Sequence, residues 1–108
     1  MLVLGITFKE NCPDIRNSRV IDIIRTLSKQ GVTIEVYDPH ADHEEVLHEY
    51  GLAILPKSAP LPSDYHAVVH AVAHKEYKET SWRTKLLPEG VFYDVKGVFD
   101  LSEVDGRL

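Results

Sequence analysis

Two basic side chains stand in one polar stretch near the start of the sequence. Lys9 and Arg16 lie seven residues apart within segment 7–17, which also contains Asp14. Lysine offers an anion a point charge, whereas arginine offers a planar fork of donors. Because Asp14 is placed to form an ion pair with Arg16, a loop-ordering role and a binding role both stay open for Arg16. The segment therefore indicates an anion site, with Lys9 as its favoured contact.

Other reactive side chains in the sequence are less well placed for chemistry. Cys12 is the single cysteine, and no histidine or aspartate is spaced to act as its base, so we expect no nucleophile there. His66, His70 and His74 recur every four residues, which aligns ligands on a helix but spreads them about 13 Å apart along a strand. Because this segment is of strand type, we expect no metal site, and we assign no catalytic residue.

The elements that must position these groups alternate between strand and helix type. Apolar or alternating runs predict strands at 2–6, 32–36, 53–55, 67–72 and 91–95. Helical spacing of apolar residues predicts one helix before residue 31, a second over 42–50 and a third over part of 75–87. The intervening segment 88–90, which contains proline and glycine, predicts a turn.

The ends and faces of the two clearest helices are also predicted. Asn17 or Ser18 caps the first helix, and Gly31 ends it. In the second helix, Val46 and Leu47 are expected to point inward. The buried face of the first helix is predicted from four apolar residues at helical spacing: Val20, Ile23, Ile24 and Leu27.

This alternation predicts one α/β domain over 1–108, a Rossmann-like three-layer α/β/α fold with a mainly parallel sheet. Ligands of such folds bind beyond the carboxyl ends of the strands, so segment 7–17, the corner at 37–39 and Lys96 should share one edge. We expect Lys9 and Arg16 to face one cleft there. Only Gly5 stands where dinucleotide-binding folds have a glycine-rich turn, so a dinucleotide is not expected to bind in the usual way. Asp38 is interpreted as shaping its corner rather than binding ligand.

The charge and hydropathy of the chain exclude several classes of partner. Seventeen acidic and twelve basic residues give a net charge of -5, and the basic residues form no cluster suited to nucleic acid. No apolar run approaches the roughly 20 residues of a membrane helix, and no signal peptide is recognisable. The lone cysteine fits a reducing compartment, so we expect a cytoplasmic protein. Because strand-type residues begin at Met1, we expect a fragment of a longer chain.

Four spaced motifs resemble a known family. The string GITFK at 5–9, followed by D-x-R-x-S at 14–18, is similar to the opening of the C-terminal domain in the UDP-glucose and UDP-mannuronate dehydrogenase superfamily. YDP at 37–39 and D-x-K-G at 94–97 continue the match in the same order, so the resemblance spans nearly the whole chain. The string FKENCPDIRN most resembles the branch acting on UDP-N-acetylgalactosamine or UDP-N-acetylglucosamine in bacterial capsule and O-antigen synthesis.

The resemblance implies the UDP-sugar-binding C-terminal domain of an NAD-dependent UDP-N-acetylhexosamine 6-dehydrogenase. Such enzymes oxidise the sugar C6 alcohol to a carboxylate in two steps, through a cysteine outside this domain. The N-terminal NAD-binding and central dimerisation regions would lie elsewhere in a homo-oligomeric parent, leaving this fragment inactive alone. The substrate would contact Phe8, Lys9 and Lys96, although many relatives have arginine where Lys96 stands. Arg16 would approach NAD.

Two other functions are weighed against this one. The first is a non-enzymatic Rossmann-like module that binds a nucleotide or a partner protein. The second is a complete small enzyme that uses Cys12. Loss of turnover on removal of Lys9 would favour the dehydrogenase over the first alternative, and replacing Cys12 by serine would test the second.

Overall fold

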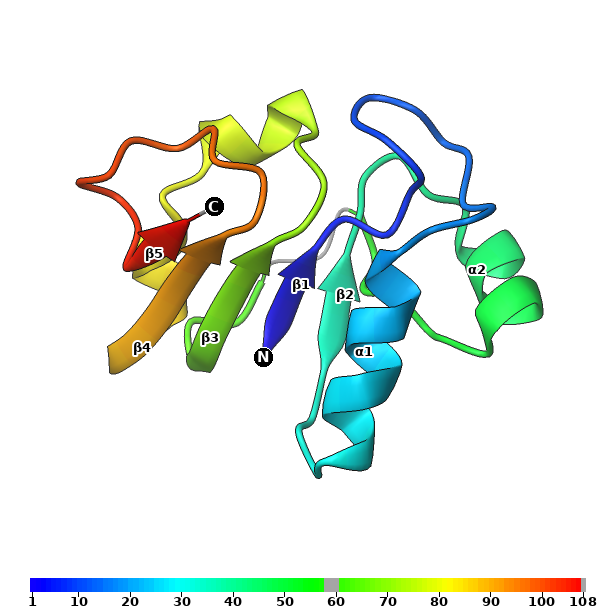
Figure 1. The fold of residues 1–108 in the computed structure, drawn as a ribbon, viewed down its shortest axis with the longest axis horizontal. Helices are drawn as coiled ribbons and strands as arrows, with labels where there is room; N and C mark the ends of the chain where they lie inside the picture. The colour runs from blue at the N-terminus through cyan, green and yellow to red at the C-terminus, as the bar shows by residue number, and fades with distance from the viewer. Residues whose placement is uncertain (58–60, 108) are drawn as a thin grey trace.

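Five strands form one parallel sheet in the computed structural model, which describes residues 1–57 and 61–107. The spatial order is β2-β1-β3-β4-β5, and every neighbouring pair is parallel (Figure 1). This arrangement confirms the predicted α/β fold with a parallel sheet. The strands are β1 (Leu2–Leu4), β2 (Glu35–Tyr37), β3 (Tyr65–His70), β4 (Leu86–Asp94) and β5 (Gly106–Arg107).

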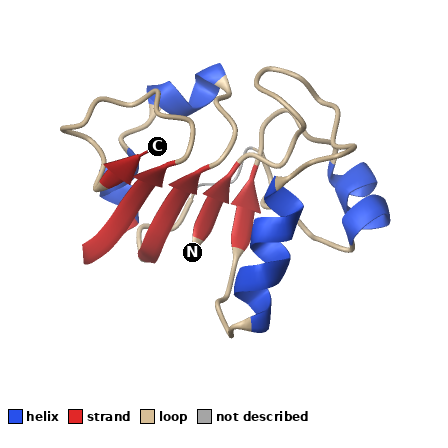
Figure 2. Ribbon diagram, viewed as in Figure 1, coloured by secondary structure: helices blue, strands red, loops and turns tan. Residues whose placement is uncertain are grey.

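Helices cover the two faces of the sheet unequally. Two α-helices, α1 (Val20–Lys29) and α2 (His43–Tyr50), pack on one apolar cluster that includes Val3 of β1. Two short 3-10 helices, η1 (Lys75–Glu79) and η2 (Trp82–Lys85), contribute to a second cluster. Leu2 and Leu4 belong to this second cluster, because successive side chains of a strand point to opposite faces. The sheet is therefore covered on both sides, with the longer helix α1 in front of β2 in Figure 2.

The segment predicted to be partly helical, 75–87, contains the two 3-10 helices instead of an α-helix. Thr80 and Ser81 between them have extended backbones, which break the helical path. Tyr77 and Trp82 are buried on either side of the break, and the Trp82 indole donates a hydrogen bond of 2.7 Å to the Tyr77 carbonyl. The segment thus bends so that both aromatic rings reach the core.

No helix in residues 1–57 or 61–107 combines the length and apolar character of a membrane span.

Helix α1 begins later than predicted, and the predicted caps are wrong. Arg19 occupies the N-cap position without a side-chain cap hydrogen bond. Asn17 has a left-handed backbone with φ of 58°, and the buried Ser18 hydroxyl has no hydrogen-bond partner among the described residues. Neither Asn17 nor Ser18 therefore occupies the N-cap position, which falls at Arg19. The predicted end is confirmed, because Gly31 has φ of 87° and its amide bonds the Ser28 carbonyl.

One residue of each predicted buried helix face is exposed instead. In α1, Ile23 is 42% exposed, and Ile21 is buried in its place. In α2, Val46 is buried as predicted, but Leu47 is 56% exposed because adjacent helical residues point about 100° apart. The start of α2 agrees with the prediction, since the Asp42 carboxylate accepts a hydrogen bond of 3.0 Å from the Glu45 amide.

Three details of the sheet differ from the sequence prediction. Segment 53–55 is not a strand, because its backbone contact with β2 is the single hydrogen bond from the Leu55 amide to the Val36 carbonyl. Segment 88–90 lies within β4 and not in a turn before it. The pairing of β3 with β4 is irregular there, because two residues of advance along β3 correspond to five along β4. The short strand β5 was not predicted, since two residues carry no periodic signal.

Gly5 is required where β1 ends beside the chain that leaves β3. Its φ is 101°, a conformation that other residues rarely adopt. A β-carbon on Gly5 would lie 2.5 Å from the β-carbon of Val72, which is too close for any real contact. The glycine therefore permits close packing inside the protein rather than approach of a ligand.

Gly5→Ala is expected to lower the free energy of unfolding by about 3 kcal/mol or more, because it combines backbone strain with overpacking. Gly31→Ala is the matched control, since Gly31 also has positive φ but no atom within 4 Å of an added β-carbon. The control should lose only about 1 kcal/mol. Urea unfolding followed by circular dichroism measures both, and equal losses would contradict the packing role of Gly5.

Candidate functional site

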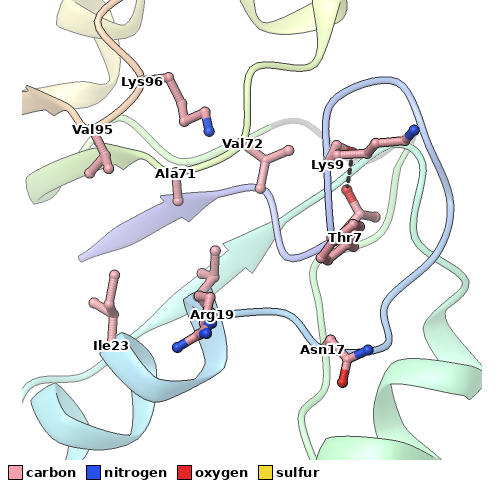
Figure 3. A pocket seen from close by; sticks show the side chains of 11 residues that line it. Thr7, Lys9, Asn17, Arg19, Ile23, Ala71, Val72, Val95 and Lys96 are labelled. Carbon is pink, nitrogen blue, oxygen red and sulfur yellow. Dashed lines mark hydrogen bonds between the residues drawn. The ribbon is translucent and has the colours of Figure 1, made fainter.

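A cleft of about 240 Å³ opens at the carboxyl ends of the central strands (Figure 3). It lies between the loop after β1, the start of α1 and the segments that follow β3 and β4. One part of its wall is apolar and includes Val20, Ile23, Val72 and Val95. The position agrees with the edge at which parallel α/β sheets bind ligands.

Three basic residues line this cleft: Lys9, Arg19 and Lys96. Within residues 1–57 and 61–107, no aspartate or glutamate lines it, although acidic residues outnumber basic ones in the chain. The ion pairs among the described residues include none of the three. The cleft therefore concentrates positive charge on a protein that is negative as a whole, which favours an anionic ligand.

The cleft brings together the three residues predicted to bind substrate. Phe8 and Lys9 enter it from the loop after β1, and Lys96 enters it after β4. In Figure 3, Lys9 and Lys96 stand on opposite sides, and the Lys9 ammonium group points along its own loop, away from Lys96. A lysine side chain has several rotatable bonds, so the direction of the Lys9 ammonium group can change with its rotamer.

Arg16 lies outside this cleft, so the expectation that it shares one with Lys9 is wrong. Its side chain is 80% exposed and forms a bidentate ion pair with Asp14, with both N–O distances 3.0 Å. The hydrogen bonds from Arg16 lower the pKa of Asp14 to about 2. This ion pair directs the guanidinium group toward a separate depression, which Glu45 and Glu49 of α2 also line.

A buried carboxylate, Asp38, organises the loop that carries Lys9. Burial by itself would raise the pKa of Asp38, but hydrogen bonds from His74 and the Ile6 amide hold it below the ordinary value. The corner role predicted for Asp38 is thus seen directly, and the carboxylate also joins the ends of β1 and β2. It accepts five hydrogen bonds: from the backbone amides of Ile6, Thr7, His40 and Ala41, and from His74 Nε2.

His74 extends this network into the loop after β1. Its Nδ1 accepts a hydrogen bond of 2.8 Å from the Asn11 amide, which assigns the ring proton to Nε2. Nε2 lies 3.0 Å from Asp38 and 3.1 Å from the Thr7 hydroxyl, which in turn donates to the Lys9 carbonyl. The backbone on both sides of Lys9 is therefore anchored to one buried pair. This network carries little signal in the sequence, because His74 and Asp38 are 36 residues apart.

A second buried carboxylate, Asp94, fixes the backbone around Lys96. It accepts hydrogen bonds from the Lys96 amide at 3.0 Å and from the Val98 and Phe99 amides at 2.8 Å each. His70 Nδ1 lies 2.7 Å from the same carboxylate. Burial lowers the pKa of His70, so the ring is neutral at pH 7 and donates to Asp94. The D-x-K-G motif is thus a turn that presents Lys96 at the cleft.

The remaining candidates of the sequence analysis lie apart from the cleft. His70 and His74 are each paired with a buried aspartate, and His66 is exposed. Within the described residues, no three histidine, cysteine, aspartate or glutamate side chains are grouped to hold a metal ion. Cys12 carries a free, half-buried thiol.

The sequence analysis assigned no role to Arg19. Its only local signal is that it is a basic residue directly before the apolar pattern of α1 begins. Its place in the cleft depends on where the start of α1 lies relative to the segments that follow β3 and β4, which the local sequence does not specify.

Comparisons with known proteins agree on one family. The family model described as "UDP-glucose/GDP-mannose dehydrogenase family, UDP binding domain" matches residues 2–101. UDP-N-acetyl-D-glucosamine 6-dehydrogenases of Pseudomonas aeruginosa and Salmonella typhi are 40% and 42% identical over the whole chain. Protein CapL of Staphylococcus aureus is 37% identical over 95% of the chain. The chain spans 26%, 26% and 24% of these relatives, or about a quarter of their length.

A solved structure supports the same fold. The UDP-N-acetyl-mannosamine dehydrogenase Cap5O from S. aureus superposes with a TM-score of 0.69 and 25% sequence identity. The match covers 98% of this chain and 24% of that one. The described elements are thus arranged as in one segment of a larger protein.

The lowered pKa values of Asp38 and Asp94 predict how acid affects the fold. Both carboxyls bind protons more weakly in the folded state, so their stabilisation is complete above about pH 5 and is lost as the pH falls below about 4. Asp38→Asn should lower the free energy of unfolding at pH 7 by about 3 kcal/mol, because an amide cannot accept all five hydrogen bonds. It should also make the acid dependence shallower.

Urea unfolding between about pH 3 and pH 7 measures these effects. Asp64→Asn, at an exposed position, is the matched control and should behave like the unchanged chain. A free energy of unfolding that stays constant down to about pH 3 in the unchanged chain would contradict the prediction.

Proposed function

The chain belongs to the UDP-glucose/GDP-mannose dehydrogenase family as its UDP-binding domain, and from this we propose that it binds the nucleotide-sugar substrate of a longer NAD-dependent 6-dehydrogenase. The substrate is a UDP-N-acetylhexosamine, which the parent oxidises at C6 to a carboxylate for bacterial surface polysaccharide, including capsule or O-antigen. The identities of 40% and 42% to UDP-N-acetyl-D-glucosamine 6-dehydrogenases support this substrate class.

The observation that carries the proposal is the basic, partly apolar cleft at the carboxyl edge of the sheet. A UDP-sugar combines a doubly charged diphosphate with a flat uracil ring and a polar sugar. Lys9 and Lys96 supply positive charge for the diphosphate. Phe8, which is 58% exposed, offers an aromatic face for a ring of the ligand. We assign substrate contact to these three residues.

The parent's NAD accepts the hydride from the substrate, but residues of this chain do not form an ordinary dinucleotide cradle. The loop after β1 is long, and its one glycine, Gly5, serves packing against Val72. We therefore propose that the N-terminal domain of the parent binds NAD. Arg16 contributes a contact on the cofactor side, for which its exposed position is suitable. To bind a cofactor phosphate, Arg16 would share or release its pairing with Asp14.

The chain then supplies half of an active site. It holds the substrate, orients it through the anchored loop and the Lys96 turn, and contributes no catalytic residue. The N-terminal NAD-binding and central dimerisation regions of the homo-oligomeric parent supply the remainder. We propose a cytoplasmic location, with which the unpaired thiol of Cys12 is consistent.

The isolated chain is expected to bind UDP weakly, with a Kd on the order of 0.1 to 1 mM, because half of the ligand's surface stays in water. Isothermal titration calorimetry measures this binding. The same chain mixed with a UDP-N-acetylhexosamine and NAD should produce no NADH absorbance. Sustained NAD reduction would refute the half-site, and no heat of binding at millimolar UDP would refute the nucleotide site.

Lys9→Ala should lower kcat/KM by about tenfold to a hundredfold in a full-length relative whose UDP-binding domain has been replaced by this chain. The reason is loss of a charge-assisted contact to substrate. Lys29→Ala, at the exposed end of α1, is the matched control and should leave turnover within about twofold. If both variants turn over like the unchanged chimaera, Lys9 is a solvated loop residue and the assignment is wrong.

A further inference from the structure

Among the described residues that line the cleft, Arg19 is the basic residue that the proposed function leaves without a role. It is exposed, lines the cleft and occupies the N-cap position of α1. In Figure 3 Arg19 lies on the α1 side of the cleft and Lys96 on the side of β4, with Ala71 and Val72 between them, and the Arg19 guanidinium group is turned away from Lys96. The two cations thus stand on two walls of one cavity.

The position of Arg19 is electrostatically unfavourable for the fold. The amino end of a helix carries partial positive charge, which disfavours a cation beside it. Arg19 does not cap the helix through its side chain, and it takes part in none of the ion pairs of the described residues, although Asp22 lies one turn later. The charge of Arg19 therefore contributes no evident stabilisation to the fold. A bound anion, by contrast, would be stabilised both by Arg19 and by the amino end of the helix.

The chemistry of the three cations is also unequal. Lys9 and Lys96 each carry a compact charge on a flexible stem. Arg19, which lines the same cleft, carries a planar guanidinium group instead. A guanidinium group can bind two phosphate oxygens at once and so fixes the orientation of the phosphate as well as its position. The apolar residues Val20 and Ile23, which belong to the same helix, line the cleft beside it.

We propose that Arg19 binds the diphosphate of the nucleotide from the α1 side of the cleft, opposite Lys96, and sets its orientation. This inference rests on the proposed function, because it adds a contact within the same nucleotide site. Arg19 is then a specificity residue for the diphosphate and not for the base. Removal of its charge should weaken every ligand that contains the diphosphate and leave a ligand without phosphate unchanged.

The test measures binding to the 108-residue chain by isothermal titration calorimetry with UDP, inorganic pyrophosphate and uridine. Arg19→Gln removes the charge and keeps most of the side chain, and Arg19→Lys keeps the charge without the planar fork. Arg25→Gln is the matched control, because Arg25 is an exposed residue of α1 that does not line the cleft. Thermal unfolding of each variant separates binding from stability.

We expect Arg19→Gln to weaken UDP and pyrophosphate about tenfold, Arg19→Lys to recover part of the loss, and Arg25→Gln to stay within about twofold. The midpoint of thermal unfolding of Arg19→Gln should be equal to or above that of the unchanged chain, since an unfavourable charge is removed. Equal UDP affinity in the unchanged chain and Arg19→Gln would overturn the inference and leave the nucleotide site intact. No UDP binding by the unchanged chain would instead refute the proposed function.

Discussion

The buried carboxylate of Asp38 is the interaction on which the candidate site depends. A charge that is fully removed from water is tolerated only when hydrogen bonds replace its hydration, and Asp38 receives five. These donors come from three separate parts of the chain: the end of β1, the corner after β2 and the segment after β3. Satisfying one charge therefore fixes three loops at the same edge of the sheet.

The same constraint explains how a long loop without a glycine-rich turn is held in place. The Asn11 amide and the Lys9 carbonyl are both tied to the Asp38 and His74 pair, directly or through Thr7. A comparable arrangement at Asp94 holds the turn of Lys96. Two buried aspartates thus position two exposed lysines, and the backbone beneath the flexible basic side chains is rigid.

The negative charges that organise the site are buried beneath it, which separates them from the negative charge of a ligand. The carboxylates of Asp38 and Asp94 are inaccessible to solvent and are surrounded by amide donors, while the side chains that line the cleft carry only positive or neutral groups. A chain with a net charge of -5 can in this way present a local anion site.

The sequence by itself determined the features that depend on neighbouring residues. Alternating and helical spacing predicted the central strands and both α-helices. Gly31 marked the end of α1 through its positive φ, and the spaced motifs indicated the family. It also gave Phe8, Lys9 and Lys96 as residues of one edge, because parallel strands bring their carboxyl ends together. All of these follow from rules that act over a few residues or from the fold class.

Only the tertiary structure decided which side chains meet. The pairing of Asp38 with His74, the exposure of Ile23 and the entry of Arg19 into the cleft depend on contacts between segments far apart in sequence. The ion pair of Arg16 with Asp14 could be anticipated, but its orientation toward α2 could not. The physical reason is that periodicity records which residues are apolar, whereas buried hydrogen bonds and helix packing fix which direction each side chain takes.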